Sequence, residues 1–178
     1  MKTLDNILGC KDLAQLLKEL EDSVAFLHTQ RRLPPAWTPA EEKRLVAMID
    51  KIDDSRLWRA LWSYLLVSRG DARIGEYCRS RLARFANIRK VNQEPGVQRP
   101  DVFLRYLFKH FPEERDALLA KFVHAQDITL RFAVAEELAK TDPDGALQQM
   151  RVLHEEAGST VYHDIFDATD LWLAEAGT

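Results

Sequence analysis

Apolar residues recur along most of this 178-residue chain at spacings of three and four positions, and no segment alternates between apolar and polar residues for long. Such spacing gathers the apolar side chains on one face of an α-helix and leaves the polar ones on the other. Stripes of this kind run from Leu13 to Leu27 and from Leu45 to Ile52. The pattern therefore predicts an all-α protein.

Helix start signals divide the chain further. Thr38 is followed by Pro39 and then by Glu41, a combination typical of a capping box with proline at the first helical position. Pro112 and Pro143 mark two later starts. With the two stripes above, further segments bring the expected number of helices to about eight or nine: 54–68, 72–88, 101–110, 113–123, 128–140, 143–156 and 159–175.

The clearest interruption of the helical pattern is the segment 91–100, which contains Asn92, Pro95, Gly96 and Pro100. This connection is long for a compact helical bundle. A chain of 178 residues nevertheless fits one domain. We therefore expect a single domain over residues 1–178, with a sub-boundary at the 91–100 loop.

One segment resembles a known repeat. Residues 127–139 are similar to the second helix of a HEAT-type repeat, whose pattern has an aspartate, a leucine-arginine pair, spaced alanines and a closing leucine. The segment 113–123 supplies the preceding helix, and 143–156 with 159–175 makes a further pair. The resemblance implies a short HEAT-like array of antiparallel helix pairs, an α-solenoid-like arrangement. The matching positions are Asp127, Leu130, Arg131, Ala133, Ala135 and Leu138.

Two arginines fall on apolar faces of the expected helices. At about 100° per residue, Arg131 lies in the middle of an apolar arc, and Arg81 lies in a comparable position. A buried charge without a partner is strongly unfavourable, so each arginine must find a carboxylate or a carbonyl. In the resembled family such an arginine bonds an aspartate of a neighbouring turn, which implies Asp127 or Asp164 here. Both arginines are predicted to tie the fold together rather than to contact a ligand.

The formal net charge of −3 hides an uneven distribution. Residues 1–90 hold 17 basic and 12 acidic side chains, whereas residues 91–178 hold 8 basic and 16 acidic ones. The basic excess is steepest between Arg56 and Lys90, where it could suit a nucleic-acid backbone. On a helical wheel, however, Arg79 points away from Arg73 and Arg84, so the charges do not form one stripe. Nucleic-acid binding is therefore the disfavoured hypothesis.

Several kinds of chemistry have no motif in this sequence. Gly70 and Gly75 lack the lysine and hydroxyl residue of a phosphate-binding loop, and there is no nucleophile elbow. Cys10 and Cys78 stand without neighbouring ligands, which argues against a zinc site or a disulfide framework and favours the reducing cytoplasm. No apolar stretch approaches the roughly 20 residues of a membrane span. We expect no cofactor, no bound metal, no membrane contact and no enzymatic activity.

The last expected helix is the most unusual segment. It is apolar around most of its circumference, so it must be covered by the rest of the chain or dock on a partner, and a homodimer through this helix is one alternative. His163 and Asp167 are four residues apart on one face. With a further ligand such as His154, that pair could hold a metal ion or transfer a proton.

The sequence thus favours a non-enzymatic protein-binding module. Small charge-polarised helical proteins without catalytic motifs resemble bacterial immunity proteins, which cap a toxin, and this resemblance implies a basic toxin or nuclease as partner. The alternatives are a HEAT-like nucleic-acid-binding protein and a small helical enzyme that uses His163 and Asp167. Complementary charge assigns the partner contacts to the C-terminal polar residues: Glu155, Glu156, His163, Asp164, Asp167 and Asp170.

Overall fold

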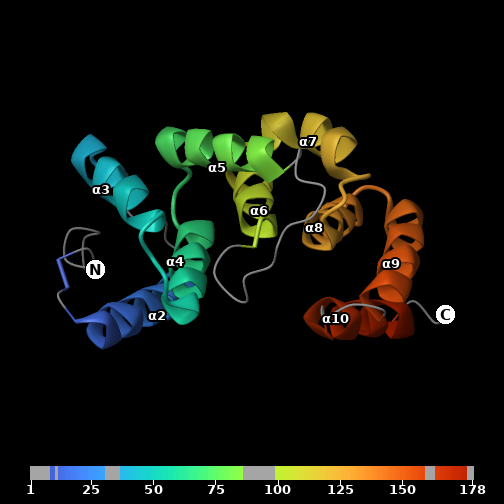
Figure 1. The fold of residues 1–178 in the computed structure, drawn as a ribbon, viewed down its shortest axis with the longest axis horizontal. Helices are drawn as coiled ribbons and strands as arrows, with labels where there is room; N and C mark the ends of the chain where they lie inside the picture. Colours follow the sequence, from blue (N-terminus) through green and yellow to red (C-terminus); the bar gives the residue numbers. More distant parts are fainter. Residues whose placement is uncertain (1–8, 11, 31–36, 86–98, 159–162, 176–178) are drawn as a thin grey trace.

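The computed structural model describes residues 9–10, 12–30, 37–85, 99–158 and 163–175, and these residues form helices joined by short turns. The all-α prediction is confirmed for this part of the chain. The helices follow one another along an arch, with α2 at one end and α10 at the other (Figure 1). Their bounds are α2 Leu13–Gln30, α3 Pro39–Ile49, α4 Ser55–Val67, α5 Ala72–Phe85, α6 Asp101–His110, η1 Pro112–Glu114, α7 Arg115–Phe122, α8 Ile128–Leu138, α9 Pro143–Gly158 and α10 His163–Glu175.

The helix starts follow the capping signals in the sequence. The capping box at α3 is formed, because the Glu41 amide donates to Thr38 Oγ1 at 3.3 Å and the Thr38 amide donates to Glu41 Oε2 at 2.8 Å. Asp54 caps α4, and Asp127 caps α8 by accepting from the amides of Thr129 at 2.8 Å and Leu130 at 3.1 Å. These caps use amides that the helix itself leaves unbonded, which fixes where each helix begins.

The structure corrects the helix predicted over 113–123, and parts of two other predicted helices lie outside the described residues. The segment expected to be helical over 113–123 is a 3-10 turn, Pro112–Glu114, followed by α7. Proline starts this turn readily, because it lacks the amide proton that a continuing helix would need. Helix α5 is described to Phe85, and the rest of its expected span, like the 91–100 loop up to Gln98, lies outside the described residues. The same holds for residues 159–162 before α10.

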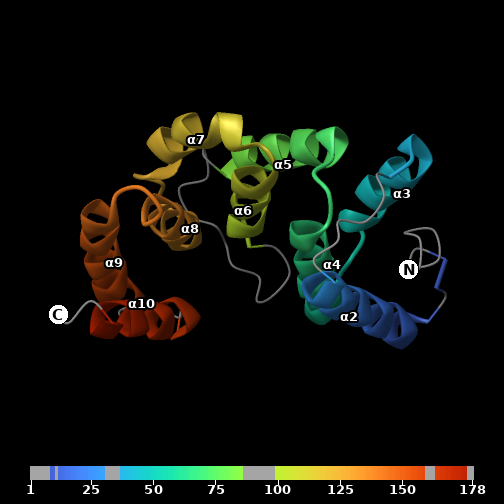
Figure 2. The same ribbon diagram turned by 180° about the vertical axis from the view of Figure 1, so that it is seen from behind.

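The helices pack in two neighbouring rows. Helix α2 contacts α4, α4 contacts α6 and α6 contacts α8. On the other side of these helices, α3 contacts α5, and α7 lies beyond α5 (Figures 1 and 2). Helix α9 then packs against α8, and α10 packs against α9. This order places α2 with α4 at one end of the arch and α10 at the other.

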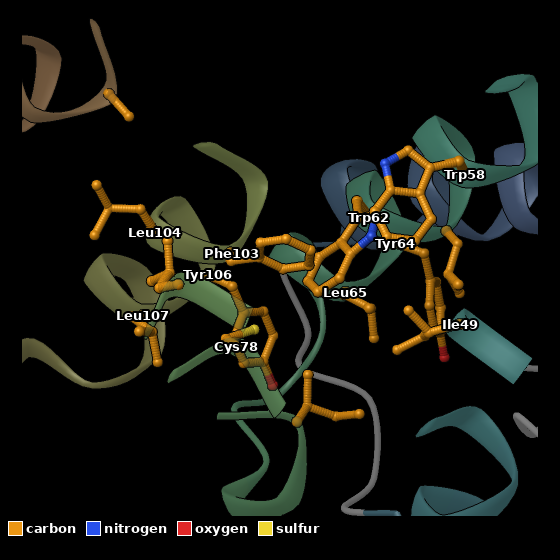
Figure 3. Packing of buried hydrophobic residues seen from close by; sticks show 14 of the residues in the cluster. Ile49, Trp58, Trp62, Tyr64, Leu65, Cys78, Phe103, Leu104, Tyr106 and Leu107 are labelled. Carbon is orange, nitrogen blue, oxygen red and sulfur yellow. The ribbon is translucent and has the colours of Figure 1, made fainter. Parts of the chain in front are cut away.

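The main hydrophobic core lies between α4, α5 and α6. Phe103 of α6 inserts its ring against the two tryptophans of α4, with ring centroids 6.1 Å from Trp58 and 5.2 Å from Trp62 (Figure 3). Tyr106, which lies on α6 like Phe103, also contacts Trp62 of α4, with ring centroids 6.1 Å apart. The pairs meet edge to face, the arrangement that aromatic quadrupoles favour. These rings hold the centre of the arch together.

A second, smaller core joins the C-terminal helices. Helix α8 serves both cores, because Leu130 and Val134 face the main one while Phe132 and Ala135 face the smaller one. Its apolar residues surround most of its circumference, as expected for a helix buried on two sides. The smaller core therefore fixes the C-terminal pair of helices to the rest of the molecule: Ile128, Phe132, Ala135, Met150, Leu153, Ala157 and Ile165.

Candidate interaction surface

Helix α10 is fixed to α9 through a single face. Ile165 and Thr169 are buried, and Trp172 is half-buried. The Thr169 hydroxyl donates to the Ile165 carbonyl at 2.9 Å, and its oxygen lies 3.1 Å from His154 Nδ1. Since the only hydroxyl proton is already used, His154 Nδ1 must be the donor of the second bond. This buried bond orients α10 and therefore determines which residues face solvent.

The outward face of α10 carries an acidic stripe, which consists of Asp167, Asp170, Leu171 and Ala174. All four are exposed, and at about 100° per residue they fall on one side of the helix. Leu171 is 61% exposed, more than the other exposed large apolar residues of the described chain. Asp167 and Asp170 make no ion pair with a described residue. The acidic stripe thus combines an exposed leucine with two carboxylates that the described residues do not neutralise by an ion pair.

The other predicted contact residues lie elsewhere or are not described. Glu155 is exposed on α9, and Glu156, also on α9, forms an ion pair with Arg131 of α8. The side chains of His163 and Asp164 lie outside the described residues. The structure therefore brings Asp167 and Asp170 together on one face and assigns Glu156 a contact within the fold.

Arg131 connects two helices, as its position on the wheel predicted, but with a different partner. Its side chain is 14% exposed and its guanidinium bonds Glu156 of the next helix. Asp127, one of the two expected partners, uses its carboxylate to cap α8 instead. The second, Asp164, has no described side chain. The bond to Asp127 is not formed, since that carboxylate accepts from the amides of Thr129 and Leu130.

Arg81 is also a structural tie. Its guanidinium pairs with Asp50 at the end of α3, and its Nε donates to the Tyr77 hydroxyl at 3.0 Å. That hydroxyl in turn donates to Asp50 Oδ1 at 2.6 Å. The three groups join α3 to α5. Burial is the main reason why the pKa of Arg81 is lowered, and the neighbouring charge of Arg84 lowers it further.

Much of the basic stretch from Arg56 onwards is neutralised within the protein. Arg79 donates from Nε to both carboxylate oxygens of Glu114, at 3.1 and 3.0 Å, and this bonding lowers the pKa of Glu114. Arg73 lies 3.7 Å from Glu42. Arg56 pairs with Asp54, and together with the backbone amides it lowers the pKa of Asp54 to about 2. Such internal pairing weakens the positive field that nucleic acid would require.

The described residues contain no group of three histidine, cysteine, aspartate or glutamate side chains that could hold a metal ion. Cys78 is fully buried, and burial raises the pKa of its thiol. His154, considered above as a further ligand, hydrogen-bonds Thr169 instead. A site at His163 would depend on side chains outside the described part.

An open groove between α2 and α4 was not predicted from the sequence. Its volume is about 480 Å³; Leu17, Val24 and Ala60 supply apolar surface, and Arg56 and Arg59 stand on the α4 side. Leu17 and Val24 belong to the apolar stripe that the sequence shows between Leu13 and Leu27. The width of that stripe could have indicated the groove, because a single neighbouring helix does not cover so wide an apolar face.

Comparison with protein-family models, with curated proteins and with solved structures found no match. No helix in the described part of the chain is both long enough and apolar enough to cross a membrane. The two exposed surfaces, the acidic stripe of α10 and the groove between α2 and α4, are therefore interpreted from their own chemistry.

Proposed function

We propose that this chain is a protein-binding module and that the acidic stripe of α10 contacts a basic surface of its partner. The observation that carries the proposal is the 61% exposure of Leu171 on the same face as Asp167 and Asp170. Covering this side chain would stabilise a complex by about 1–2 kcal/mol. The flanking carboxylates would add orientation and a faster encounter with a basic partner.

The specific form of this proposal is an inhibitor or immunity protein that caps a bacterial toxin. Enzymes that act on nucleic acids carry basic clefts, because they must hold a phosphate backbone. An acidic helix that projects an apolar residue is complementary to the rim of such a cleft. The acidic excess of residues 91–178 would also attract a basic partner toward this end of the protein over longer distances.

We further propose that the two rows of helices from α2 to α8 are a short HEAT-like array. The support is the succession of contacts from α2 through α4 and α6 to α8, beside the contact of α3 with α5. In such an array each helix pair contacts mainly its neighbours, so that the two ends remain available for partners. Helix α10 would then be a terminal helix that binds rather than one that only shields the core.

The proposal is tested by affinity capture from the native cell, followed by quantitative mass spectrometry. The bait proteins are the unaltered chain, an Asp167→Lys/Asp170→Lys variant and a Glu113→Lys/Asp116→Lys variant. The Glu113→Lys/Asp116→Lys variant is the control: it changes the net charge as much as the α10 variant does, but at exposed residues of η1 and α7. We expect at least one protein to be captured by the unaltered and control baits and lost at least about tenfold with the α10 variant.

Two further results would decide the outcome. A captured protein that inhibits growth when it is expressed alone, and does not when this chain is co-expressed, would support the inhibitor form. If every captured protein binds the α10 variant as well as it binds the control, the acidic stripe is not the binding surface. All three baits must give the same circular dichroism spectrum and melting temperature, which excludes unfolding as the cause.

A further inference from the structure

The groove between α2 and α4 has the shape and chemistry of a docking site for a helix. Its lining on α4 is about two turns long, from Arg56 to Ser63, and its apolar surface comes mainly from Leu17 and Val24 of α2. Arg59 is exposed, and among the described residues it has no carboxylate partner; its Nε reaches only the Ser55 carbonyl, at 3.4 Å. Arg56 is 71% exposed even though it pairs with Asp54. The α4 side of the groove therefore presents two accessible guanidinium groups.

The acidic stripe of α10 matches this groove in spacing and in charge. Asp167 and Asp170 are three residues apart, and so are Arg56 and Arg59, so that each pair spans about 4.5 Å along its helix axis. Leu171, which follows the two aspartates on the same face, would enter the apolar part of the groove. Glu21 stands on the α2 side, and its repulsion would place the aspartates against α4.

The two surfaces of one chain cannot meet each other. The α2–α4 pair and α10 lie at opposite ends of the arch, with the remaining helices between them (Figures 1 and 2). Two different copies can bring them together. Because the interface uses a different surface on each copy, it leaves a groove free at one end and an acidic stripe free at the other.

We propose that copies of this chain associate head to tail, with the acidic stripe of α10 from one copy seated in the α2–α4 groove of the next. This goes beyond the proposed function, since it concerns the free protein and holds whether or not a basic partner exists. The contact is small compared with the interface of roughly 1,200–2,000 Å² in stable complexes. A dissociation constant between about 10 µM and 1 mM is expected, and any basic partner on α10 would compete with it.

The test measures molecular mass by sedimentation equilibrium up to about 1 mM protein, with two variants. The stripe variant is Asp167→Asn/Asp170→Asn/Leu171→Asn, and the groove variant is Arg56→Gln/Arg59→Gln. All five residues are exposed, so both variants are expected to fold. The unaltered protein should grow beyond a dimer with rising concentration and shrink with rising salt. Each variant alone should associate at least about tenfold more weakly.

The mixture of the two variants is the decisive arm, because it restores one intact groove and one intact stripe. We expect a one-to-one heterodimer that does not grow further. The controls Glu113→Gln/Asp116→Asn and Lys43→Gln/Lys51→Gln remove equal charge from other exposed positions and should associate like the unaltered protein. A monomer at every concentration, an unchanged variant or a mixture that stays monomeric would overturn the proposal. A groove variant that associates like the parent, beside a stripe variant that does not, would indicate symmetric α10 pairing instead.

Discussion

At the scale of single residues, charged side chains hold the helices together more than the sequence suggested. Arg115 of α7 donates from Nε to Glu137 of α8 at 3.0 Å, and Arg131 of α8 pairs with Glu156 of α9. The helical wheel predicted that Arg131 would lie on an apolar face, which the structure bears out. It could not identify the partner, because Glu156 lies on another helix and a wheel describes only one.

The glycines of α5 show a similar limit. Gly75 was considered for a phosphate loop and rejected, but its packing role was not foreseen. A Cβ atom at Gly75 would lie 2.6 Å from Phe111 Cζ, so the helix needs glycine for the ring to come this close. The guanidinium of Arg79 also lies over that ring, 4.7 Å from its centroid. The contact joins residues distant in sequence, and no local pattern announces it.

The cap of α8 gives a prediction at this scale. Replacing Asp127 by alanine leaves the amides of Thr129 and Leu130 without their acceptor, and the free energy of unfolding should fall by about 1 kcal/mol. Asp127→Asn keeps a side-chain oxygen at the same place and should cost much less. Urea unfolding of the three proteins measures the difference. Equal losses for alanine and asparagine would show that the cap does not stabilise the helix.

Glu42 gives a prediction about pH. A hydrogen bond with Asp71 raises its pKa most, and burial and the Asp71 charge raise it further, while Arg73 opposes the shift. A raised pKa in the folded state means that protonation favours folding. This stabilisation is complete below the ordinary pKa of glutamate and is lost as pH rises through the raised value.

The variant Glu42→Gln resembles the protonated side chain at every pH. It should therefore be more stable than the unaltered protein at pH 7, and the two should converge below about pH 4. Glu76→Gln on the exposed face of α5 controls for the loss of one carboxylate. Thermal melting between pH 4 and pH 7 measures this. A constant difference between Glu42→Gln and the parent across that range would contradict the account.

At the scale of elements, the helices could be predicted closely because their signals are local. The capping box at Thr38 fixed one start, and the apolar period together with Pro112 and Pro143 placed the helices between 101 and 158. What failed was local too: Pro112 begins a 3-10 turn before α7, not a continuous helix. The apolar stripe of α2 did not reveal how much of it a neighbour covers, and Leu17 lines an open groove while Leu16 and Leu20 are buried.

The contact of α4 with α6 should dominate the stability of the molecule. Phe103 is completely buried against Trp58 and Trp62, so Phe103→Ala should lower the free energy of unfolding by about 3–5 kcal/mol. Phe26 of α2 is 45% exposed, and Phe26→Ala provides the matched control, with an expected loss below about 1 kcal/mol. Denaturant unfolding measures both. Similar losses would show that the aromatic cluster is not the centre of the fold.

At the scale of the whole molecule, charge is distributed along the arch in a way that composition alone conceals. Three arginines of the N-terminal half, Arg73, Arg79 and Arg81, are bonded to carboxylates within the protein. Asp167 and Asp170 have no such ion pair among the described residues. The sequence singled out both by their charge, and Asp167 also by its spacing from His163, and the structure places both on an open face. It could not predict that Glu156 would be used within the fold, since that depends on how α9 packs on α8.

The account's central claim is that the acidic stripe binds a basic protein, and association kinetics test it most directly. The measurement is the association rate constant of the captured partner with the unaltered chain and with Asp167→Lys/Asp170→Lys, from low to high salt. We predict that the rate falls with salt for the unaltered chain and is at least about tenfold lower for the variant at low salt, with a smaller change in dissociation. Equal association rates for the two proteins at low salt would contradict the claim.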